Sequence, residues 1–550
     1  DDLKRFSPPA GPIIDGLDVE TGRTFVTRNP ATGAPLAEVM RGGPGEIDAA
    51  VAAARKAFLH WGGRSPRERR KHLEALLEAV RRSHDELARL VSTEQGKPVA
   101  EARALDLVPA ADALRYLARH AEELLAERPV DYEQLLFAHK AASDRYEPLG
   151  VIAVITPWNF PFAIPMVEVA ACLAAGNTVV LKPASATPRT GLAIGELCRM
   201  AGLPPGVVNV VPAAGADADR LLEHPGVAKI LFTGSVETGR HVMREAAGNV
   251  TPFVLELGGK DAAVVAADAD LERTANGLVW GAFANAGQAC GSIERVYAVR
   301  EVADELVSRV VEKTRRLRQG DPLAAATDLG PMTTAEQRDL VDAHVREAVA
   351  QGARALTGGE RPAAKGNWFP PTVLVDVHHG MRVMTEETFG PVLPIAVVDT
   401  LDEAIALAND SEFALTASGW TRSTRTARKL VEELRAGTVT INDHLFSFGE
   451  PTASWGGLGK SGIGRSHGVH GLRELVNVKH VSVDLDSSPS APWWYPYDGA
   501  FQQFMRKAFG VLYARDARTR VADGLGLLAS GRFFGYVKVS TIASNLGKVL

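Results

Sequence analysis

Three residues of this chain have the side chains needed for covalent chemistry on a carbonyl group. Cys290 ends the small-residue run FANAGQAC, and it is one of only three cysteines among 550 residues. Glu256 stands inside the apolar run of VLELGGKDAAVV, where partial desolvation would raise the pKa of its carboxyl toward that of a general base. Asn159, in TPWNFPF, offers an amide donor. A thiol nucleophile, a base and a donor to an oxyanion together indicate acyl chemistry.

Each of these residues also has an ordinary structural interpretation. A buried cysteine is most often inert, a glutamate at a strand end is commonly held in a salt bridge, and an asparagine between prolines is typical of a turn. The combination of the three favours catalysis. Gly287 and Gly291, on either side of Cys290, would let backbone and ligand approach the thiol closely.

A phosphate site is predicted where ILFTGSVETG passes from an apolar run into a helical pattern. Gly234 and Ser235 would place exposed amides at the N-terminus of that helix, where the helix dipole favours an anion. A simple helix cap at Ser235 is the alternative. The GxGxxG spelling within 455–464 follows Pro451 rather than an apolar strand, so we interpret that segment as a Gly-rich turn.

The elements that must hold these residues alternate between short apolar runs and helical patterns. Apolar residues recur at helical spacing over 46–61 and 67–90, so the opening hundred residues are expected to be largely helical. Beyond Leu149 the alternation predicts βαβ units, parallel sheets and two α/β domains. The predicted strands are 151–155, 177–182, 207–211, 228–232, 253–257, 261–265, 295–299, 371–377, 393–398 and 437–442.

The composition is that of a large globular chain. With 46% hydrophobic residues and a formal net charge of −5, neither disorder nor a general attraction to nucleic acid is expected. Cys172, Cys198 and Cys290 are odd in number and widely spaced, which argues against a disulfide framework and against paired metal ligands. We therefore expect no metal site and a reducing, cytoplasmic location. No signal segment or membrane span is expected.

Seven sequence motifs occur in order between Asp15 and Val483: TPWNFPF, LKPAS, FTGSVETG, LELGGK, FANAGQAC, EETFGP and GKSGIGR. Together they resemble the aldehyde dehydrogenase superfamily. The resemblance implies that Cys290 attacks the aldehyde carbon to form a thiohemiacetal, and that Asn159 and the backbone amide of Cys290 hold the oxyanion. Hydride transfer to a nicotinamide would leave a thioester, which Glu256 would help water to hydrolyse.

The same resemblance implies a set of contacts to NAD or NADP. They are Trp158 beside the nicotinamide end, Lys182 and Ser185 at the adenosine ribose, Gly234 and Ser235 near the pyrophosphate, Glu387 at the nicotinamide ribose, Phe389 packing nearby, and Leu257. Relatives that strongly prefer NAD commonly carry Glu where this chain has Ser185. Since Ser185 beside Lys182 leaves room and positive charge for a 2′-phosphate, we expect NADP to be accepted.

The substrate pocket is expected to be apolar. The helical segment after Asn159 offers Phe160, Phe162, Met166 and Val167, and the small residues Ala289 and Gly291 flank the thiol, which favours apolar aliphatic or aromatic aldehydes.

The runs IERVYAV and INDHLFSFGEP are most similar to a bacterial branch that includes broad-range and succinate-semialdehyde enzymes. A succinate-semialdehyde dehydrogenase is the first alternative function, although no arginine stands out to bind a second carboxylate. A CoA-acylating or phosphorylating enzyme is less favoured, because Glu256 favours water as acyl acceptor. A non-catalytic binding or structural protein on the same fold is the remaining alternative.

The family fold implies three parts. A Rossmann-like cofactor-binding domain would cover 1–128 and 148–257, a catalytic α/β domain 258–472, and a small β oligomerisation arm 129–147 and 473–487, which would build a homodimer or homotetramer. The extension 488–550 lies beyond the family pattern. Between 493 and 550 it has eight Lys or Arg against three Asp, and its apolar residues from Phe501 to Leu512 share one helical face. We expect that face to pack on protein, with contact to a membrane surface as the alternative.

Overall fold

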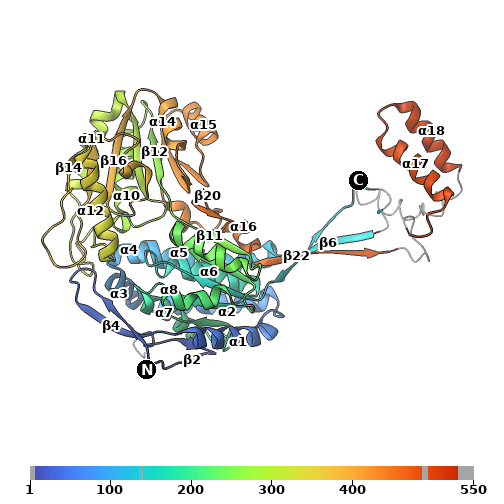
Figure 1. Cartoon of the computed structure of the whole chain (residues 1–550), viewed down its shortest axis with the longest axis horizontal. Helices are drawn as coiled ribbons and strands as arrows, with labels where there is room; N and C mark the ends of the chain where they lie inside the picture. Colours follow the sequence, from blue (N-terminus) through green and yellow to red (C-terminus); the bar gives the residue numbers. More distant parts are fainter. Residues whose placement is uncertain (1–5, 135–136, 138–139, 486–493, 530–550) are drawn as a thin grey trace. The chain divides into compact units, whose positions relative to one another are not determined.

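The computed structural model describes residues 6–134, 137, 140–485 and 494–529, and the chain divides into two compact units. The first unit comprises Asp1–Leu124 and Pro148–Val476, and the second comprises Leu125–Glu147 and Asn477–Leu550. The first unit contains two large α/β sheets, so the predicted fold class is confirmed (Figure 1). The predicted cofactor-binding and catalytic domains fall within this one unit, apart from a few residues at their ends.

The first sheet has eight strands, in the order β2-β1-β9-β8-β7-β10-β11-β21. Its centre is parallel, and β7, β8 and β10 carry apolar residues on both faces because helices cover both sides. The carboxyl ends of β7, β10 and β11 lie side by side, which brings the segments that follow them to one edge. The bounds are β1 (Ile13–Ile14), β2 (Leu17–Asp18), β7 (Val151–Ile155), β8 (Thr178–Lys182), β9 (Val208–Val210), β10 (Lys229–Thr233), β11 (Phe253–Glu256) and β21 (Gly462–Ile463).

The second sheet has seven strands, in the order β14-β15-β16-β13-β12-β18-β19, and every pairing except β14 with β15 is parallel. Its strands are β12 (Asp261–Val265), β13 (Ile293–Val299), β14 (Arg354–Thr357), β15 (Thr372–Val375), β16 (Val392–Val398), β18 (Thr416–Trp420) and β19 (Thr438–Ile441). All ten predicted strands therefore exist, with ends that differ by at most a few residues. The sequence did not predict β14 and β18 of this sheet, nor β1, β2 and β21 of the first, and β1 and β2 lie in the opening residues that were expected to be largely helical.

Helices flank both sheets (Figure 1). The predicted helix 67–90 is in fact two helices, because the chain turns at Ser83 between α2 and α3. The helices of the first unit are α1 (Pro44–Trp61), α2 (Pro66–Arg82), α3 (His84–Gln95), α4 (Val99–Glu101), the π-helix η1 (Ala102–Leu107), α5 (Val108–Leu124), α6 (Ala163–Ala175), α7 (Pro188–Met200), α8 (Gly215–Leu222), α9 (Val236–Ala247), α10 (Leu271–Phe283), α11 (Arg300–Arg315), α12 (Ala335–Ala350), α13 (Arg382–Thr385), α14 (Leu401–Asn409), α15 (Thr424–Glu433) and α16 (Gly468–Arg473). Short turns of 3₁₀ helix, η3 (Ala284–Gly287) and η4 (Phe446–Gly449), and the paired strands β3 (Thr24–Arg28) and β4 (Pro35–Met40) complete the unit.

The Gly-rich segment 455–464 contains two short strands, β20 (Leu458–Gly459) and β21, joined by a turn. β20 pairs with β17 (Phe413–Ala414), and β21 pairs with β11. A Cβ atom on Gly462 would lie 2.1 Å from the carbonyl oxygen of Leu255, so this glycine allows the two backbones to approach.

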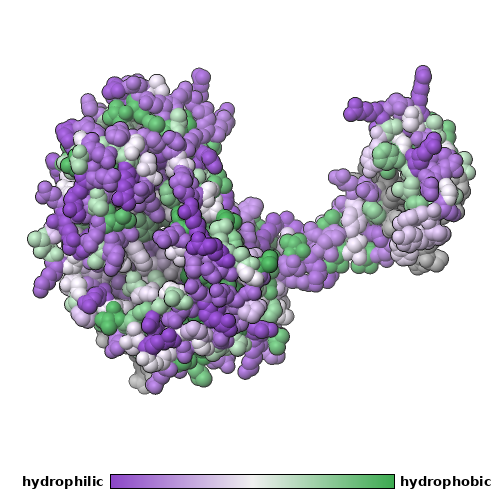
Figure 2. All heavy atoms as spheres, in the orientation of Figure 1, coloured by the Kyte–Doolittle hydropathy of each residue, from purple (hydrophilic) through white to green (hydrophobic). Residues whose placement is uncertain are grey.

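The second unit is a three-stranded sheet followed by two helices. Its sheet has the order β22-β6-β5, formed by β5 (Arg128–Pro129), β6 (Lys140–Pro148) and β22 (Val476–Asp484). Lys140 pairs with Asp484 across β6 and β22 at 2.6 Å. These strands fall within or beside the predicted arm. Hydrophilic and hydrophobic residues are mixed over the surface of this unit (Figure 2).

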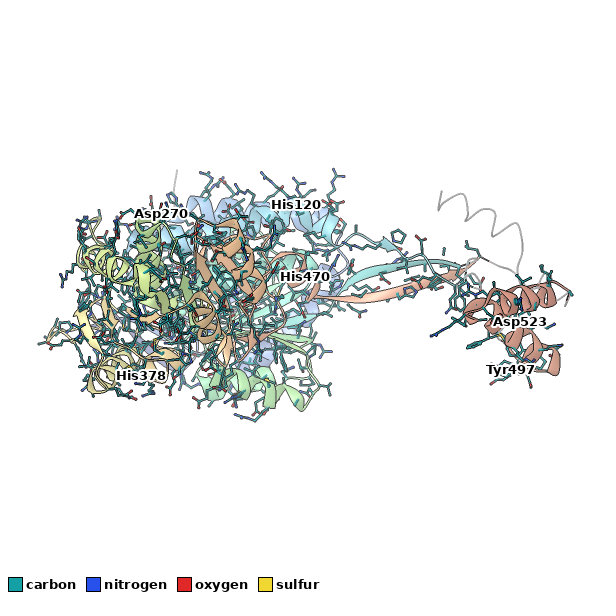
Figure 3. The ribbon with its side chains drawn as sticks, turned by 90° about the horizontal axis from the view of Figure 1, so that it is seen from above. His120, Asp270, His378, His470, Tyr497 and Asp523 are labelled. Carbon is teal, nitrogen blue, oxygen red and sulfur yellow. The ribbon has the colours of Figure 1, made fainter. Side chains whose placement is uncertain are left out.

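The extension forms a helical pair, α17 (Gly499–Tyr513) and α18 (Ala517–Leu528). Phe504, Ala508 and Leu527 are buried between the two helices, whose side-by-side packing is visible near Tyr497 and Asp523 (Figure 3). Met505, Phe509 and Leu512, which the sequence placed on the same face as Phe504, are exposed together with Tyr513, Leu525 and Leu528. In the described part of the chain no helix has the length and apolar character to cross a membrane. Residues 486–493, at the junction of the arm and the extension, and residues 530–550 of the extension lie outside the described part.

Candidate active site

Cys290 lies in a strained loop between α10 and β13. Asn285 and Ala286 have φ angles of 55° and 54°, a left-handed conformation that costs free energy for residues other than glycine. Buried hydrogen bonds hold the loop in this shape. The Asn285 side chain donates to the carbonyl of Asn159 at 2.9 Å and to that of Gln288 at 3.0 Å, and it accepts from the Gln95 side chain at 2.9 Å. The loop is therefore fixed directly to the segment that carries Asn159.

A buried ion pair fixes Asn159 itself. The Lys97 ammonium donates to the carbonyl of Asn159 at 2.8 Å and to the Asp106 carboxylate at 2.5 Å, and both charged side chains are fully buried. Asp106 in turn accepts from the backbone amides of Phe162 and Ala163 at 3.1 and 2.9 Å. This pair orders the turn between β7 and α6. No local sequence pattern indicates this pair, because Lys97 lies more than 60 residues from Asn159 along the chain.

Two cavities meet at Cys290, whose side chain is half-buried. The first has a volume of about 290 Å³ and is mostly apolar. Its walls include Leu105, Val108, Phe160, Ile164, Trp280, Ala289, Leu445, Phe448 and Trp455, with Glu450 as the one charged residue among those described. Aromatic rings contact one another there, Phe160 stacking on Phe448 at 6.0 Å and Phe448 meeting Trp455 edge-on at 5.5 Å. We call this space the apolar cavity.

The second cavity, of about 280 Å³, lies at the carboxyl edge of the first sheet. Six of the eight residues predicted to contact a dinucleotide border it: Trp158, Gly234, Ser235, Leu257, Glu387 and Phe389. Asn159 borders it as well. The Ser235 hydroxyl caps α9 by accepting from the amide of Thr238, and the Trp158 and Phe389 rings meet edge-on at 5.5 Å. We call this space the dinucleotide cavity.

Two consecutive glycines, Gly258 and Gly259, leave room for the carboxyl group of Glu387 at the dinucleotide cavity. A Cβ atom on Gly258 would lie 2.3 Å from its carboxyl, and the amide of Gly259 donates to it at 3.0 Å. Burial, and next the neighbouring Glu294, raise the pKa of Glu387 to about 8. The backbone here is shaped to receive a carboxyl group, which accepts the hydrogen bond of the Gly259 amide.

Lys182 and Ser185 do not border the dinucleotide cavity. Lys182 ends β8, opposite Ile155 of β7, and burial lowers its pKa to about 8. The Ser185 hydroxyl donates weakly to the carbonyl of Ala213 at 3.4 Å. Lys182 is the last residue of β8, the strand next to β7, and Ser185 lies in the turn that follows β8. Both residues are therefore at the same edge of the sheet as the cavity.

Glu256 is not where the sequence reasoning expected it. Its carboxyl borders neither cavity at Cys290, but a third, buried one of about 10 Å³, shared with Glu168, Arg465 and Ser466. Burial, and next the charge of Glu168, raise the pKa of Glu256 well above its usual value, as predicted in direction. Arg465 and the nearby Ser466 hydroxyl lower this pKa in part, yet neither carboxyl oxygen of Glu256 has a hydrogen bond of normal geometry within the described residues. The next two residues, Leu257 and Gly258, border the dinucleotide cavity.

The thiol of Cys290 is protonated in the resting protein. Burial, followed by the neighbouring carboxyl groups of Asp261, Glu256 and Glu387, raises its pKa, against a smaller effect of the Gly291 amide. These carboxyl groups oppose ionisation of the thiol, so a thiolate at this position needs a base to form.

The pocket residues were only partly predicted. Phe160 and Ala289 border the apolar cavity, whereas Phe162 and Met166 are buried in the core and Val167 borders a smaller neighbouring cavity. The sequence signal that was missed is the aromatic run after β19, which supplies Phe448 and Trp455.

The sheets and the paired cavities define a class of protein, the aldehyde dehydrogenase fold, in which a cysteine loop and a dinucleotide cavity face each other. The chain belongs to the aldehyde dehydrogenase family, a family of aldehyde-oxidising enzymes, because the family model matches residues 18–481. The resemblance inferred from the motifs is thus confirmed at the level of the family.

Solved structures agree with this assignment. An NADP-dependent enzyme from E. coli is 35% identical, with a TM-score of 0.84 over 88% of this chain and 100% of that one. An aldehyde dehydrogenase from Bacillus cereus in complex with NAD+ is 35% identical, with a TM-score of 0.83 over 87% and 97%. A betaine aldehyde dehydrogenase from Staphylococcus aureus in complex with NAD+ is 32% identical, with a TM-score of 0.84 over 89% and 97%.

Proposed function

We propose that this protein oxidises aldehydes to carboxylic acids with a nicotinamide dinucleotide as the hydride acceptor. The observation that carries the proposal is that Cys290 borders both the apolar cavity and the dinucleotide cavity. A substrate carbonyl bound to this sulfur would face the cofactor on one side and bury its hydrocarbon part on the other. The relatives in complex with NAD+ and the NADP-dependent relative support the choice of cofactor.

The residues of the dinucleotide cavity fit such a cofactor. Ser235 and Gly234 stand at the N-terminus of α9, which suits a pyrophosphate. Glu387, held by the Gly259 amide, suits a ribose hydroxyl, and Trp158 offers an aromatic surface. When bound there, the nicotinamide accepts the hydride of the aldehyde carbon and so supplies the oxidation of thiohemiacetal to thioester.

The chain's own groups carry the addition step. The Cys290 sulfur bonds to the carbonyl carbon as its proton passes to a base, for which we assign Glu256. The developing oxyanion accepts from the Cys290 backbone amide and from the Asn159 side chain, which uses one N–H for Gln288 and keeps the other.

Glu256 must turn from its buried cavity to take part. Its backbone precedes Leu257 and Gly258 at the edge of the dinucleotide cavity, so rotation of the side chain can carry the carboxyl toward Cys290. Once Glu256 has released the thiol proton to solvent, its carboxylate takes a proton from water, the water oxygen attacks the thioester carbon, and the Cys290 sulfur leaves with the electron pair of the broken C–S bond. The carboxylic acid is released.

The apolar cavity supports apolar aliphatic or aromatic aldehydes as substrates. Succinate semialdehyde fits less well, because no Lys or Arg borders this cavity within the described residues and Glu450 would repel its carboxylate. Hydrogen bonds from Thr452 lower the pKa of Glu450, which keeps it ionised.

A cationic aldehyde is a second candidate substrate. Aromatic rings together with one carboxylate are the groups that bind quaternary ammonium ions, and this cavity has Trp280, Phe448 and Trp455 beside Glu450. The betaine aldehyde dehydrogenase among the relatives gives this candidate further weight.

The proposal is tested with a panel of aldehydes and both cofactors, following the reduced nicotinamide. The panel contains an aliphatic, an aromatic, a quaternary ammonium and a carboxylate-bearing aldehyde. We expect the highest kcat/KM for the uncharged aldehydes, and Cys290→Ala should abolish turnover while cofactor binding persists. Cys172→Ala, which removes a buried thiol from α6, is the matched control and should keep its activity. Absence of turnover with every aldehyde and both cofactors would refute the proposal.

A further inference from the structure

One buried acidic residue has no part in the reaction as described above. Glu168 lies on α6, and its carboxyl borders the same buried cavity as Glu256. Only 7% of Glu168 and 5% of Glu256 is exposed to solvent. The Thr233 hydroxyl donates to one oxygen of Glu168 at 3.0 Å, and the other oxygen has no partner within the described residues.

The surroundings do not neutralise two negative charges. The charge of Arg465 lowers the pKa of Glu256 in part, but its guanidinium donates to the carbonyls of Gly457 and Gly464, at 3.3 and 2.7 Å, instead of to a carboxyl. Lys229 of β10 is already bonded to Glu474 at 2.5 Å.

The thiol of Cys172, also on α6, stays protonated, because burial and then Glu168 raise its pKa. Burial also raises the pKa of Glu168 to about 8. The cavity itself, at about 10 Å³, has room for at most one water molecule. Two carboxylates in such a space cannot both ionise at neutral pH.

We propose that the neighbouring carboxyls of Glu168 and Glu256, the carboxyl pair, carry at most one negative charge between them, and that Glu168 thereby sets the pH at which Glu256 becomes available as the base. Glu168 is a positioning residue: it does not touch the substrate, but a negative charge on it disfavours ionisation of Glu256 in their common cavity. When Glu256 leaves the pair as a carboxylate, the proton stays as an O–H bond on Glu168. The inference rests on the proposed role of Glu256 in thioester hydrolysis.

The link to Thr233 connects this pair to the site. Thr233 borders the dinucleotide cavity and donates its hydroxyl hydrogen to Glu168. Thr233 of β10 is also the residue that pairs with Glu256 of β11 in the sheet. The pair therefore lies directly behind the wall of the dinucleotide cavity.

The experiment measures hydrolysis of the acyl-enzyme against pH. An activated ester such as 4-nitrophenyl acetate acylates Cys290 without hydride transfer, so the burst reports acylation and the steady rate reports hydrolysis. In Glu168→Gln the amide keeps the shape but removes the second acid. We expect the acidic limb of the steady rate to move down by at least about one pH unit, which is a tenfold higher rate on that limb. Glu168→Asp restores a carboxyl and should move the limb back toward that of the wild type.

Controls separate this inference from the proposed function. Cys172→Ala perturbs the packing of α6 without removing a carboxyl and should leave the pH profile unchanged. If the wild type gives no burst at all, the proposed role of Cys290 fails. If the wild type gives a burst and Glu168→Gln has the same acidic limb, the carboxyl pair is refuted. If Glu168→Gln does not fold, Glu168→Asp provides the test. Its shorter side chain moves the two carboxyl groups apart, so the acidic limb should lie below that of the wild type in pH, by less than the shift expected for Glu168→Gln. An acidic limb identical to that of the wild type would refute the carboxyl pair.

Discussion

The side-chain amide of Asn159 donates a hydrogen bond of 3.1 Å to the carbonyl of Gln288, two residues before Cys290. This bond joins the turn after β7, in the first sheet, to the loop before β13, in the second. Because Asn285 bonds to the carbonyls of both residues, Asn159 and the loop that carries Cys290, our proposed oxyanion donor and nucleophile, are held as one group. Such preorganised donors need no rearrangement as charge develops on the substrate.

Asn159→Ala should lower kcat by roughly 10² to 10³, the usual effect of losing one oxyanion donor. We expect a smaller change in KM, since the lost bond forms mainly in the transition state. Steady-state kinetics with the best aldehyde of the panel measures both values. A decrease in kcat of less than tenfold, with the acylation burst intact, would show that the backbone amide of Cys290 alone stabilises the oxyanion.

Lys97→Met should destabilise the protein, because it leaves the buried Asp106 carboxylate without its partner. Breaking a buried ion pair by removing one member costs about 3–5 kcal/mol in the free energy of unfolding. Urea unfolding followed by far-UV circular dichroism measures the difference. The double variant Lys97→Met with Asp106→Leu is the matched control, and it should recover part of the loss. If the single variant were as stable as the wild type, the pair would not be what orders the turn.

The strands could be predicted from the sequence because most of them are apolar runs buried on both faces, such as VIAVI at 151–155. β18 was missed since its sequence, TASGW, is made mainly of small residues that pack closely: a Cβ atom on Gly419 would lie 2.7 Å from Leu430. The break at Ser83 was missed because both helices share the apolar spacing of a single long one.

The candidate site could be predicted as a set of residues but not as a geometry. Phe160 and Ile164, four residues apart, both face the apolar cavity, whereas Phe162 and Met166 point into the core, and helical spacing alone does not say which pair faces the ligand. The direction of the Glu256 side chain depends on a cavity made by residues from four separate segments. Lys97 and Asp106 have a role only through contacts that are distant in sequence.

We expect the exposed apolar face of α17 and α18 to pack on protein. Removing residues 488–550 should then change the number of subunits in the oligomer or the preference among aldehydes. Light scattering and the aldehyde panel measure these two effects. The double variant Phe509→Ser with Tyr513→Ser, which alters two exposed residues and keeps both helices, is a milder test of the same face. If only binding to anionic liposomes were lost, a membrane surface would be the partner instead.

Ser185→Glu should turn the enzyme toward NAD. A carboxylate at this position would accept hydrogen bonds from both ribose hydroxyls and repel a 2′-phosphate, so we expect kcat/KM with NADP to fall at least about tenfold, equivalent to 1.4 kcal/mol. The value with NAD should stay the same or rise. Ser185→Gln has a similar size without the charge and serves as the control. Exclusive use of NAD by the wild type would refute our expectation that NADP is accepted.

The preference for NADP over NAD should depend on pH through Lys182. Burial lowers the pKa of this ammonium to about 8, so it is charged below that pH and loses its proton above it. A 2′-phosphate becomes doubly negative above its second pKa of about 6. The attraction between the two groups is therefore strongest between about pH 6 and pH 8, and it weakens as the pH rises further. We expect the ratio of kcat/KM for NADP to that for NAD to be highest near pH 7 and several-fold lower at pH 9. Lys182→Met should abolish the pH dependence of this ratio, and a wild-type ratio that stays constant from pH 7 to pH 9 would show that Lys182 does not bind the phosphate.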